Sequence, residues 1–191
     1  MRRAWRFVWI AFQGAILVAI TVLLVAVTAR FSDGPIAVFP GGPLISGIAT
    51  EYEAVDWSRL AHIRELEFQL ETPARSRTTR FFLHANAPYI PCAFCSNRIL
   101  KRWPRELEHD DRVVLRVDGM LIQGRAKRVP NDSAEYVAAK RAHALKYSQP
   151  SDSRSGAEER AAKVVVGVAR LVAGTPDPSE PDSWLYRVDP R

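Results

Sequence analysis

An uncharged apolar segment near the N-terminus constrains this chain most. Residues 7–29 carry no charge, and Gln13, Thr21 and Thr28 are their only polar interruptions. As an α-helix the segment is ~35 Å long, which exceeds the ~30 Å hydrocarbon core of a bilayer. Lipid offers no hydrogen-bond partners to a backbone, so an isolated segment of this kind must be helical. The sequence therefore predicts that residues 7–29 form one transmembrane helix, which contacts membrane lipid.

The distribution of basic residues around this segment predicts its orientation. Three arginines lie within residues 2–6, whereas Arg30 alone follows the segment and the next basic residue is Arg59. The positive-inside rule places the N-terminus in the cytoplasm and exports the rest, to the periplasm or the cell exterior. The alternative is a cleaved signal peptide ending near Ala29. Signal-peptide apolar cores usually span ~7–15 residues, so the length favours a signal anchor in the inner (plasma) membrane.

The positive charge of the chain belongs largely to this anchor. The formal net charge is +6, which first suggests a nucleic-acid partner. Residues 1–30 contain four arginines and no acid, which leaves 23 Lys and Arg against 21 Asp and Glu in the remainder. The exported part is nearly neutral, and we expect it to bind no nucleic acid.

The exported part divides into a linker at residues 31–62 and a domain at residues 63–191. In the linker, apolar runs at 36–39 and 44–45 flank Pro-Gly-Gly-Pro at 40–43, which predicts a juxtamembrane hairpin. In the domain, strict alternation at 65–71 and an Asp-Gly turn at 118–119 are typical of strands and of a hairpin. The expected strands are 65–71, 78–85, 112–117, 120–129 and 183–189.

Helices are expected at fewer places. Asp132-Ser133-Ala134-Glu135 is a capping-box pattern that opens a helix to about residue 147. Residues 86–111 look irregular, with one short helix at 97–102 or 104–109, and residues 158–173 suit a helix or a strand. The predicted fold class is α+β, mainly β: an antiparallel barrel with one or two helices, preceded by the transmembrane helix.

Cys92 and Cys95 are the only cysteines and are spaced as Cys-x-x-Cys. This spacing suits a structural disulfide, a redox pair or half of a metal site, in that order of preference. Ser96 excludes the haem attachment motif, and nothing in the histidine spacing completes a metal site, so no metal is predicted.

Four stretches carry a resemblance to a known family. Residues 84–89, 101–107, 112–119 and 124–126 resemble the FMN-binding split β-barrel superfamily, which includes pyridoxamine phosphate oxidase relatives and deazaflavin-dependent nitroreductases. The family's Trp…Asn-Leu segment corresponds to Trp103-Pro104-Arg105-Glu106-Leu107, in which Glu106 replaces the Asn. The resemblance implies a split barrel over about residues 63–147.

The resemblance also implies a cofactor, FMN or a deazaflavin, bound in a crevice. Its phosphate would be held by Lys101, Arg102 and Arg105, while Trp103 would line the ring pocket and His84 and Asn86 would approach from a strand end. It implies a homodimer as well. The residues alone allow a plainer interpretation of each position. Lys101 and Arg102 would form a solvated basic surface, Trp103 would belong to the core, and His84 would have no function.

Two functions follow from these patterns. The first is an anchored flavin- or deazaflavin-dependent oxidoreductase acting on a small acceptor such as a quinone or nitro compound, with no catalytic residue assigned. The alternative is a non-catalytic exported envelope binding module with a structural Cys92–Cys95 disulfide. No Ser/His/Asp arrangement, Gly-rich phosphate loop or carboxylate pair is recognisable in the sequence.

Overall fold

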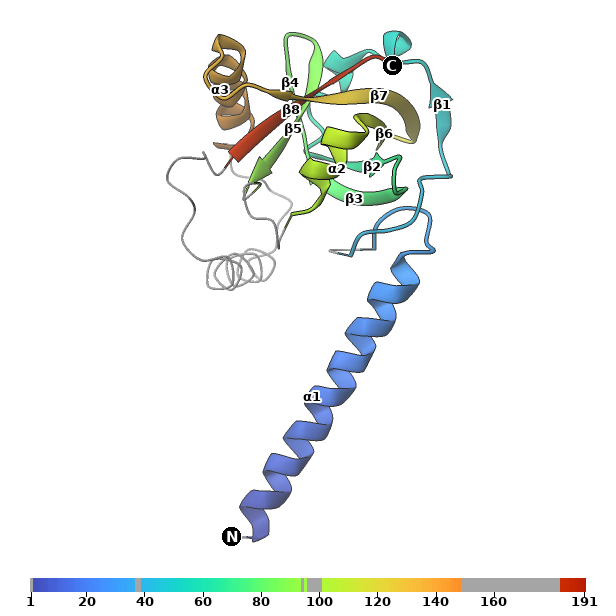
Figure 1. Cartoon of the computed structure of the whole chain (residues 1–191), viewed down its shortest axis with the longest axis vertical. Helices are drawn as coiled ribbons and strands as arrows, with labels where there is room; N and C mark the ends of the chain where they lie inside the picture. The colour runs from blue at the N-terminus through green and yellow to red at the C-terminus, as the bar shows by residue number, and fades with distance from the viewer. Residues whose placement is uncertain (1, 37–38, 94, 96–100, 149–182) are drawn as a thin grey trace.

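One long helix stands apart from the rest of the chain (Figure 1). The computed structural model describes residues 2–36, 39–93, 95, 101–148 and 183–191. Helix α1, Arg2–Ala29, extends away from the barrel, and nearly all of its described side chains are exposed. Within it, residues Phe12–Ala29 are long and apolar enough to act as a membrane span or a signal anchor.

A curled antiparallel sheet forms the body of the domain. Its hydrogen-bonded order is β3-β2-β6-β7-β8-β5-β4. The two flanks curl toward each other so that β3 contacts β5 without being its ladder neighbour. The strands are β2 Glu65–Leu70, β3 Arg75–Arg80, β4 Phe82–His84, β5 Ala87–Ala93, β6 Arg112–Val117, β7 Met120–Val129 and β8 Ser183–Asp189. The predicted fold class, a mainly antiparallel barrel-like sheet after an apolar N-terminal helix, is confirmed.

One strand departs from the antiparallel pattern. Strand β1, Ile48–Thr50, lies within the predicted linker and pairs with β7 in parallel, with Ala49 opposite Leu121. A parallel pair needs a long crossover connection, and residues 51–119 supply it. Strand β1 therefore adds to the sheet a segment that the sequence pattern assigns to the linker.

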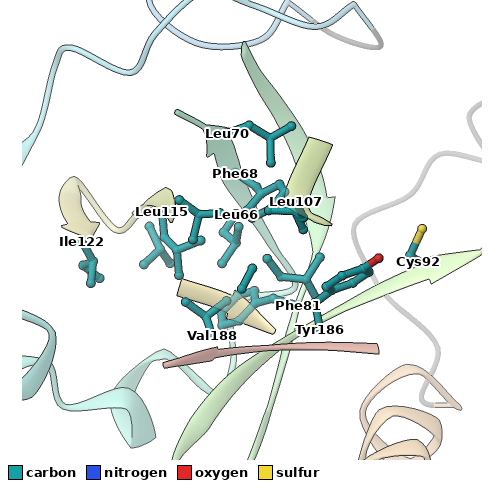
Figure 2. Packing of buried hydrophobic residues seen from close by; sticks show 14 of the residues in the cluster. Leu66, Phe68, Leu70, Phe81, Cys92, Leu107, Leu115, Ile122, Tyr186 and Val188 are labelled. Carbon is teal, nitrogen blue, oxygen red and sulfur yellow. The ribbon is translucent and has the colours of Figure 1, made fainter. Parts of the chain in front are cut away.

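The core lies between the curled strands (Figure 2). Alternation explains it: Val113, Leu115 and Val117 of β6 are buried while the residues between them are partly exposed. Phe68 of β2 is fully buried beside them, a burial that contributes about 1.5–3 kcal/mol to folding.

One short α-helix and one longer one pack on the sheet. The second of the two predicted positions for a short helix is correct, because α2 spans Trp103–His109. Helix α3, Ala134–Ser148, packs on β4 and buries Ala139. Its N-terminus is capped one residue later than the sequence pattern suggests, since Ser133 Oγ accepts a hydrogen bond from Tyr136 N at 3.0 Å. Two 3₁₀ turns, η1 Tyr52–Ala54 and η2 Trp57–Leu60, precede β2.

The structure corrects the prediction between residues 72 and 111. Strand β3 begins at Arg75, three residues before the predicted strand 78–85, and that predicted strand divides into β3 and β4. Strand β5 lies where an irregular segment was expected, because Pro88 and Pro91 mask a strand pattern. Ala85 and Asn86 join β4 to β5 with φ of 49° and 60°, the left-handed conformation of a two-residue hairpin.

Among the described residues of the predicted juxtamembrane hairpin, no bridge joins 36–39 to 44–45. Ile36 instead bridges Phe39, and Gly41 bridges Ser76 of β3. Trp57 and Leu60 of the predicted linker are buried in the core, at 2% and 3% exposed. The boundary at residue 62 stays a prediction. Residues 97–100 of the predicted helix at 97–102, and the whole predicted element at 158–173, lie outside the described residues.

Candidate functional site

A desolvated arginine lies in the wall of the barrel. Arg77 of β3 stands directly opposite Phe68 of β2, and directly opposed residues of an antiparallel pair share a face of the sheet. Its guanidinium carbon lies 5.7 Å from the ring centroid of Trp103. Within the described residues, Arg77 Nε is buried and has no hydrogen-bond partner. Burial lowers the pKa of Arg77 to about 10, against the opposing effect of Glu106.

A second cation lies close enough to interact with Arg77. Burial lowers the pKa of Lys101, and the positive charge of Arg77 lowers it further. Two cations that have lost water and repel each other are costly unless an anion accompanies them. Lys101 and Arg77, with the Trp103 ring over which Arg77 lies, form what we call the cation pair site.

Trp103 belongs to the core. Its side chain is 4% exposed, and its ring centroid lies 5.5 Å from that of Phe68 and 5.0 Å from that of Tyr186. The first turn of α2 holds it there, with Pro104 following as an early helical residue whose missing N–H costs nothing. Trp103 therefore borders the cation pair site without offering an open face to a ligand ring.

The remaining predicted site residues divide into two groups. Arg102 is exposed at the start of α2, and Arg105 is half-buried in its first turn. His84 and exposed Asn86 flank the β4–β5 turn, where the His84 ring lies 5.8 Å from that of Tyr89. Among the hydrogen bonds, ion pairs and ring contacts of described residues, none joins these two groups. The ligand-binding roles of the six residues stay predictions.

Sequence reasoning missed Arg77. The signal was present, because Arg75-Ser76-Arg77 alternates charged and small residues across from the alternating strand 65–70. The preceding Thr72-Pro73-Ala74 made this stretch look like a loop.

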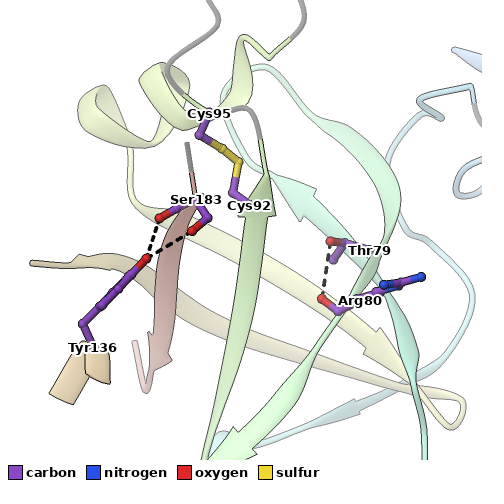
Figure 3. Close-up of a disulfide and its surroundings, with 6 residues drawn as sticks. All are labelled: Thr79, Arg80, Cys92, Cys95, Tyr136 and Ser183. Atoms are coloured by element: carbon purple, nitrogen blue, oxygen red, sulfur yellow. Dashed lines mark hydrogen bonds between the residues drawn. A yellow bond between two sulfur atoms is a disulfide. The ribbon is translucent and has the colours of Figure 1, made fainter. Parts of the chain in front are cut away.

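Cys92 and Cys95 form a disulfide at the end of β5 (Figure 3). Their Cα atoms are 5.9 Å apart, and the two residues are 1% and 2% exposed. Cys92 pairs with Trp184 of β8, so the disulfide lies beside the strand that closes the sheet. The preferred prediction, a disulfide, is confirmed. Among the described residues, no group of three or more His, Cys, Asp or Glu side chains is placed to hold a metal ion.

A cavity of about 660 Å³ lies between α2 and β7. Most of the cations that line it have carboxylate partners: Arg125 contacts Asp111 at 2.6 Å, and Arg112 contacts Asp110 at 2.6 Å. Such paired charges have little to gain from an added anion. The cation pair site differs because no ion pair within the described residues joins Arg77 or Lys101 to a carboxylate, and Glu106 acts on Arg77 only at longer range.

No family model and no curated protein matches this sequence. Two solved structures show a likeness in fold. One is a Listeria innocua protein described as a "Putative Pyridoxamine 5'-phosphate oxidase", with a TM-score of 0.37 and 10% identity over 70% of this chain and 89% of that one. The other is HutZ, the heme storage protein from Vibrio cholerae, with a TM-score of 0.38 and 14% identity over 71% of this chain and 88% of that one. At such identities, what those proteins bind is not transferred to this chain.

Proposed function

We propose that this chain is a membrane-anchored, exported barrel protein that binds a small phosphate-bearing ligand at the cation pair site. The observation that carries the proposal is the buried Nε of Arg77, which has no hydrogen-bond partner in the described part of the chain, beside the desolvated Lys101. Charge-assisted hydrogen bonds to phosphate are short and strong, and arginine is well suited to form two at once. A phosphate would therefore accept the hydrogen bond that Arg77 Nε lacks, and its negative charge would offset the repulsion between the two cations.

The ligand class that we propose is FMN or a deazaflavin. Arg77 and Lys101 fit the phosphate of such a cofactor. Trp103 does not fit the role of a ring-pocket wall, because its ring is packed between Phe68 and Tyr186. When bound, a flavin supplies hydride transfer, here to a quinone or nitro acceptor, while the protein holds and orients it.

The second candidate function is a non-catalytic exported binding module. The buried disulfide favours it, because a structural disulfide suits an oxidising compartment, whereas a redox-active pair needs an exposed thiol of lowered pKa. In this function the site holds a phosphate-bearing ligand without any reaction.

Binding to the purified full chain in detergent separates the two functions. A ligand at ~100 times its dissociation constant adds ~2.7 kcal/mol to the free energy of unfolding. The oxidoreductase proposal predicts this gain with FMN or a deazaflavin, together with the visible absorption bands of a bound flavin. The module predicts a gain with inorganic phosphate and none beyond it with FMN. If phosphate, FMN and a deazaflavin all leave the melting temperature unchanged, the anion site itself is contradicted.

A further inference from the structure

Bulky apolar side chains are exposed on the segment that joins α1 to the barrel. We call residues 30–36 and 39–46 the juxtamembrane loop. Phe31 is 85% exposed, Ile45 72% and Ile36 40%. Water penalises such a grouping, whereas a lipid interface accommodates it. Figure 1 shows the loop at the end of α1, between the helix and the barrel.

The described part of this loop is packed against the end of α1. Ala29, the last residue of the helix, is fully buried although most of the helix is exposed. Gly42 N donates to Ser32 O at 3.2 Å. A Cβ at Gly42 would lie 2.7 Å from the carbonyl oxygens of Arg30 and Ser32, so only glycine permits this approach. The loop therefore keeps a fixed place relative to the helix end.

Hydrogen bonds also hold the loop closed. Asp33 accepts from Ile45 N at 2.7 Å and from Ser46 N at 3.1 Å, which brings the two ends of the loop together. Ile45 is thereby placed near Asp33, four residues beyond the end of α1. The exposed Ile45 side chain therefore lies near the end of α1, where a membrane-spanning helix would leave the bilayer.

The loop is tied to the barrel at three positions. Gly41 and Ser76 exchange backbone hydrogen bonds of 2.9 and 3.2 Å. Leu44 N donates to Gln69 Oε1 of β2 at 2.5 Å. Arg116 of β6 contacts Asp33 at 2.8 Å and also pairs with Glu67. A displacement of the loop would therefore carry the barrel with it.

We propose that the juxtamembrane loop lies in the lipid interface, with Phe31, Ile36 and Ile45 at the boundary between headgroups and acyl chains. The inference rests on the proposed membrane anchoring. Phe31 follows Ala29 by two residues, and two extended residues reach at most ~7 Å, about the thickness of one headgroup layer. The ties to β2, β3 and β6 then fix the orientation of the barrel above the bilayer. Arg77 directly follows Ser76, so the cation pair site lies on a strand that is bound to this loop.

Depth-dependent quenching by brominated phosphatidylcholine in liposomes tests this inference on the full chain. The chain's two cysteines form a disulfide, so a single introduced cysteine takes an environment-sensitive fluorophore specifically. Ile45→Cys reports the loop. Leu145→Cys on α3 is a matched control, because Leu145 is also 72% exposed. Val18→Cys, at the middle of α1, reports the anchoring itself.

We expect the Val18 probe to be quenched most by deeply brominated lipid and the Leu145 probe not to be quenched. The Ile45 probe should be quenched by shallow bromines, at a depth of ~5–10 Å below the headgroups. Quenching at Val18 with none at Ile45 would overturn the loop inference and leave the anchoring intact. Equal quenching at Ile45 and Leu145 would also overturn it. An unquenched Val18 probe would instead overturn the anchoring, and the loop inference with it.

Discussion

Arg77 is held in the barrel wall without the water that normally surrounds a guanidinium. Its strand position opposite Phe68 sets this placement, and the neighbouring Lys101 adds like-charge repulsion. A residue that only stabilised the fold would not be kept in such surroundings, because buried charges without full pairing cost stability. An anionic ligand better explains why an arginine occupies position 77.

Replacing Arg77 should therefore stabilise the ligand-free protein. We expect Arg77→Met to raise the free energy of unfolding by about 1 kcal/mol or more, because an apolar chain of similar length removes the desolvated charge. Chemical denaturation of the full chain in detergent, in phosphate-free buffer, measures it. A clear loss of stability would mean that Arg77 is a structural residue with partners of its own.

Asp33 provides a second prediction at this scale, one that depends on pH. The backbone hydrogen bond from Ile45, followed by the side-chain hydrogen bond from Ser46, holds the pKa of Asp33 well below its usual 3.8. A carboxylate with a lowered folded-state pKa contributes stability that is present above 3.8 and is lost as the pH falls below that value. Asp33→Asn should be less stable than the wild type at neutral pH.

The difference between the two proteins should shrink as the pH falls below 3.8. Denaturation curves at several pH values measure it. Asp118→Asn is a suitable control, because asparagine tolerates the left-handed φ of 50° that Asp118 adopts in the β6–β7 turn. A difference that does not change with pH would contradict the contribution assigned to the Asp33 carboxylate.

At the scale of elements, the structure shows which of two neighbouring residues caps the N-terminus of α3. The sequence pattern begins at Asp132, whereas in the structure Ser133 Oγ accepts from Tyr136 N. Ser133→Ala should lower the free energy of unfolding by ~0.5–2 kcal/mol through loss of the N-cap. Asp132→Ala should change it little, and the opposite ranking in thermal denaturation would show that Asp132 is the cap.

Elements with a periodic pattern could be predicted from sequence. Strand β2 and the β6–β7 hairpin alternate apolar and polar residues, and Asp118-Gly119 has the backbone freedom that their turn requires, with φ of 50° and 74°. Strand β5 could not be predicted, because its two prolines cannot donate to a ladder and usually exclude a strand. Tertiary pairing with β4 and β8 overrides that local signal.

The candidate site could be predicted only in part. The basic segment around Lys101 and Trp103 was recognisable, but Arg77 lies 24 residues earlier, on β3, and only the β2–β3 register and the position of α2 bring it to Trp103. His84 and Asn86 are predicted to bind the cofactor because both are polar residues at a strand end. In the structure Asn86 occupies a left-handed turn position that asparagine tolerates well, which explains it without a ligand.

At the scale of the whole molecule, the disulfide and the anchor make linked predictions. If the barrel is exported, Cys92 and Cys95 are oxidised in cells. Thiol trapping followed by denaturation should label neither cysteine without reductant and both with it; denaturation is needed because both are buried. A reporter fused after Arg191 should give the signal of an exported domain. Labelled thiols with an exported reporter would contradict the disulfide, whereas a cytoplasmic reporter would contradict the orientation.

The most direct test of the cation pair site is a titration of the full chain in detergent with FMN, comparing wild type, Arg77→Met and Arg80→Met. Arg80 lies on the same strand and is exposed, so its replacement removes the same charge outside the site. Loss of charge-assisted hydrogen bonds worth ~1.5–3 kcal/mol should weaken binding ~10- to ~100-fold in Arg77→Met, at ~1.4 kcal/mol per tenfold, and leave Arg80→Met unchanged. Equal affinities of Arg77→Met and the wild type, or no binding by the wild type, would contradict the proposed site.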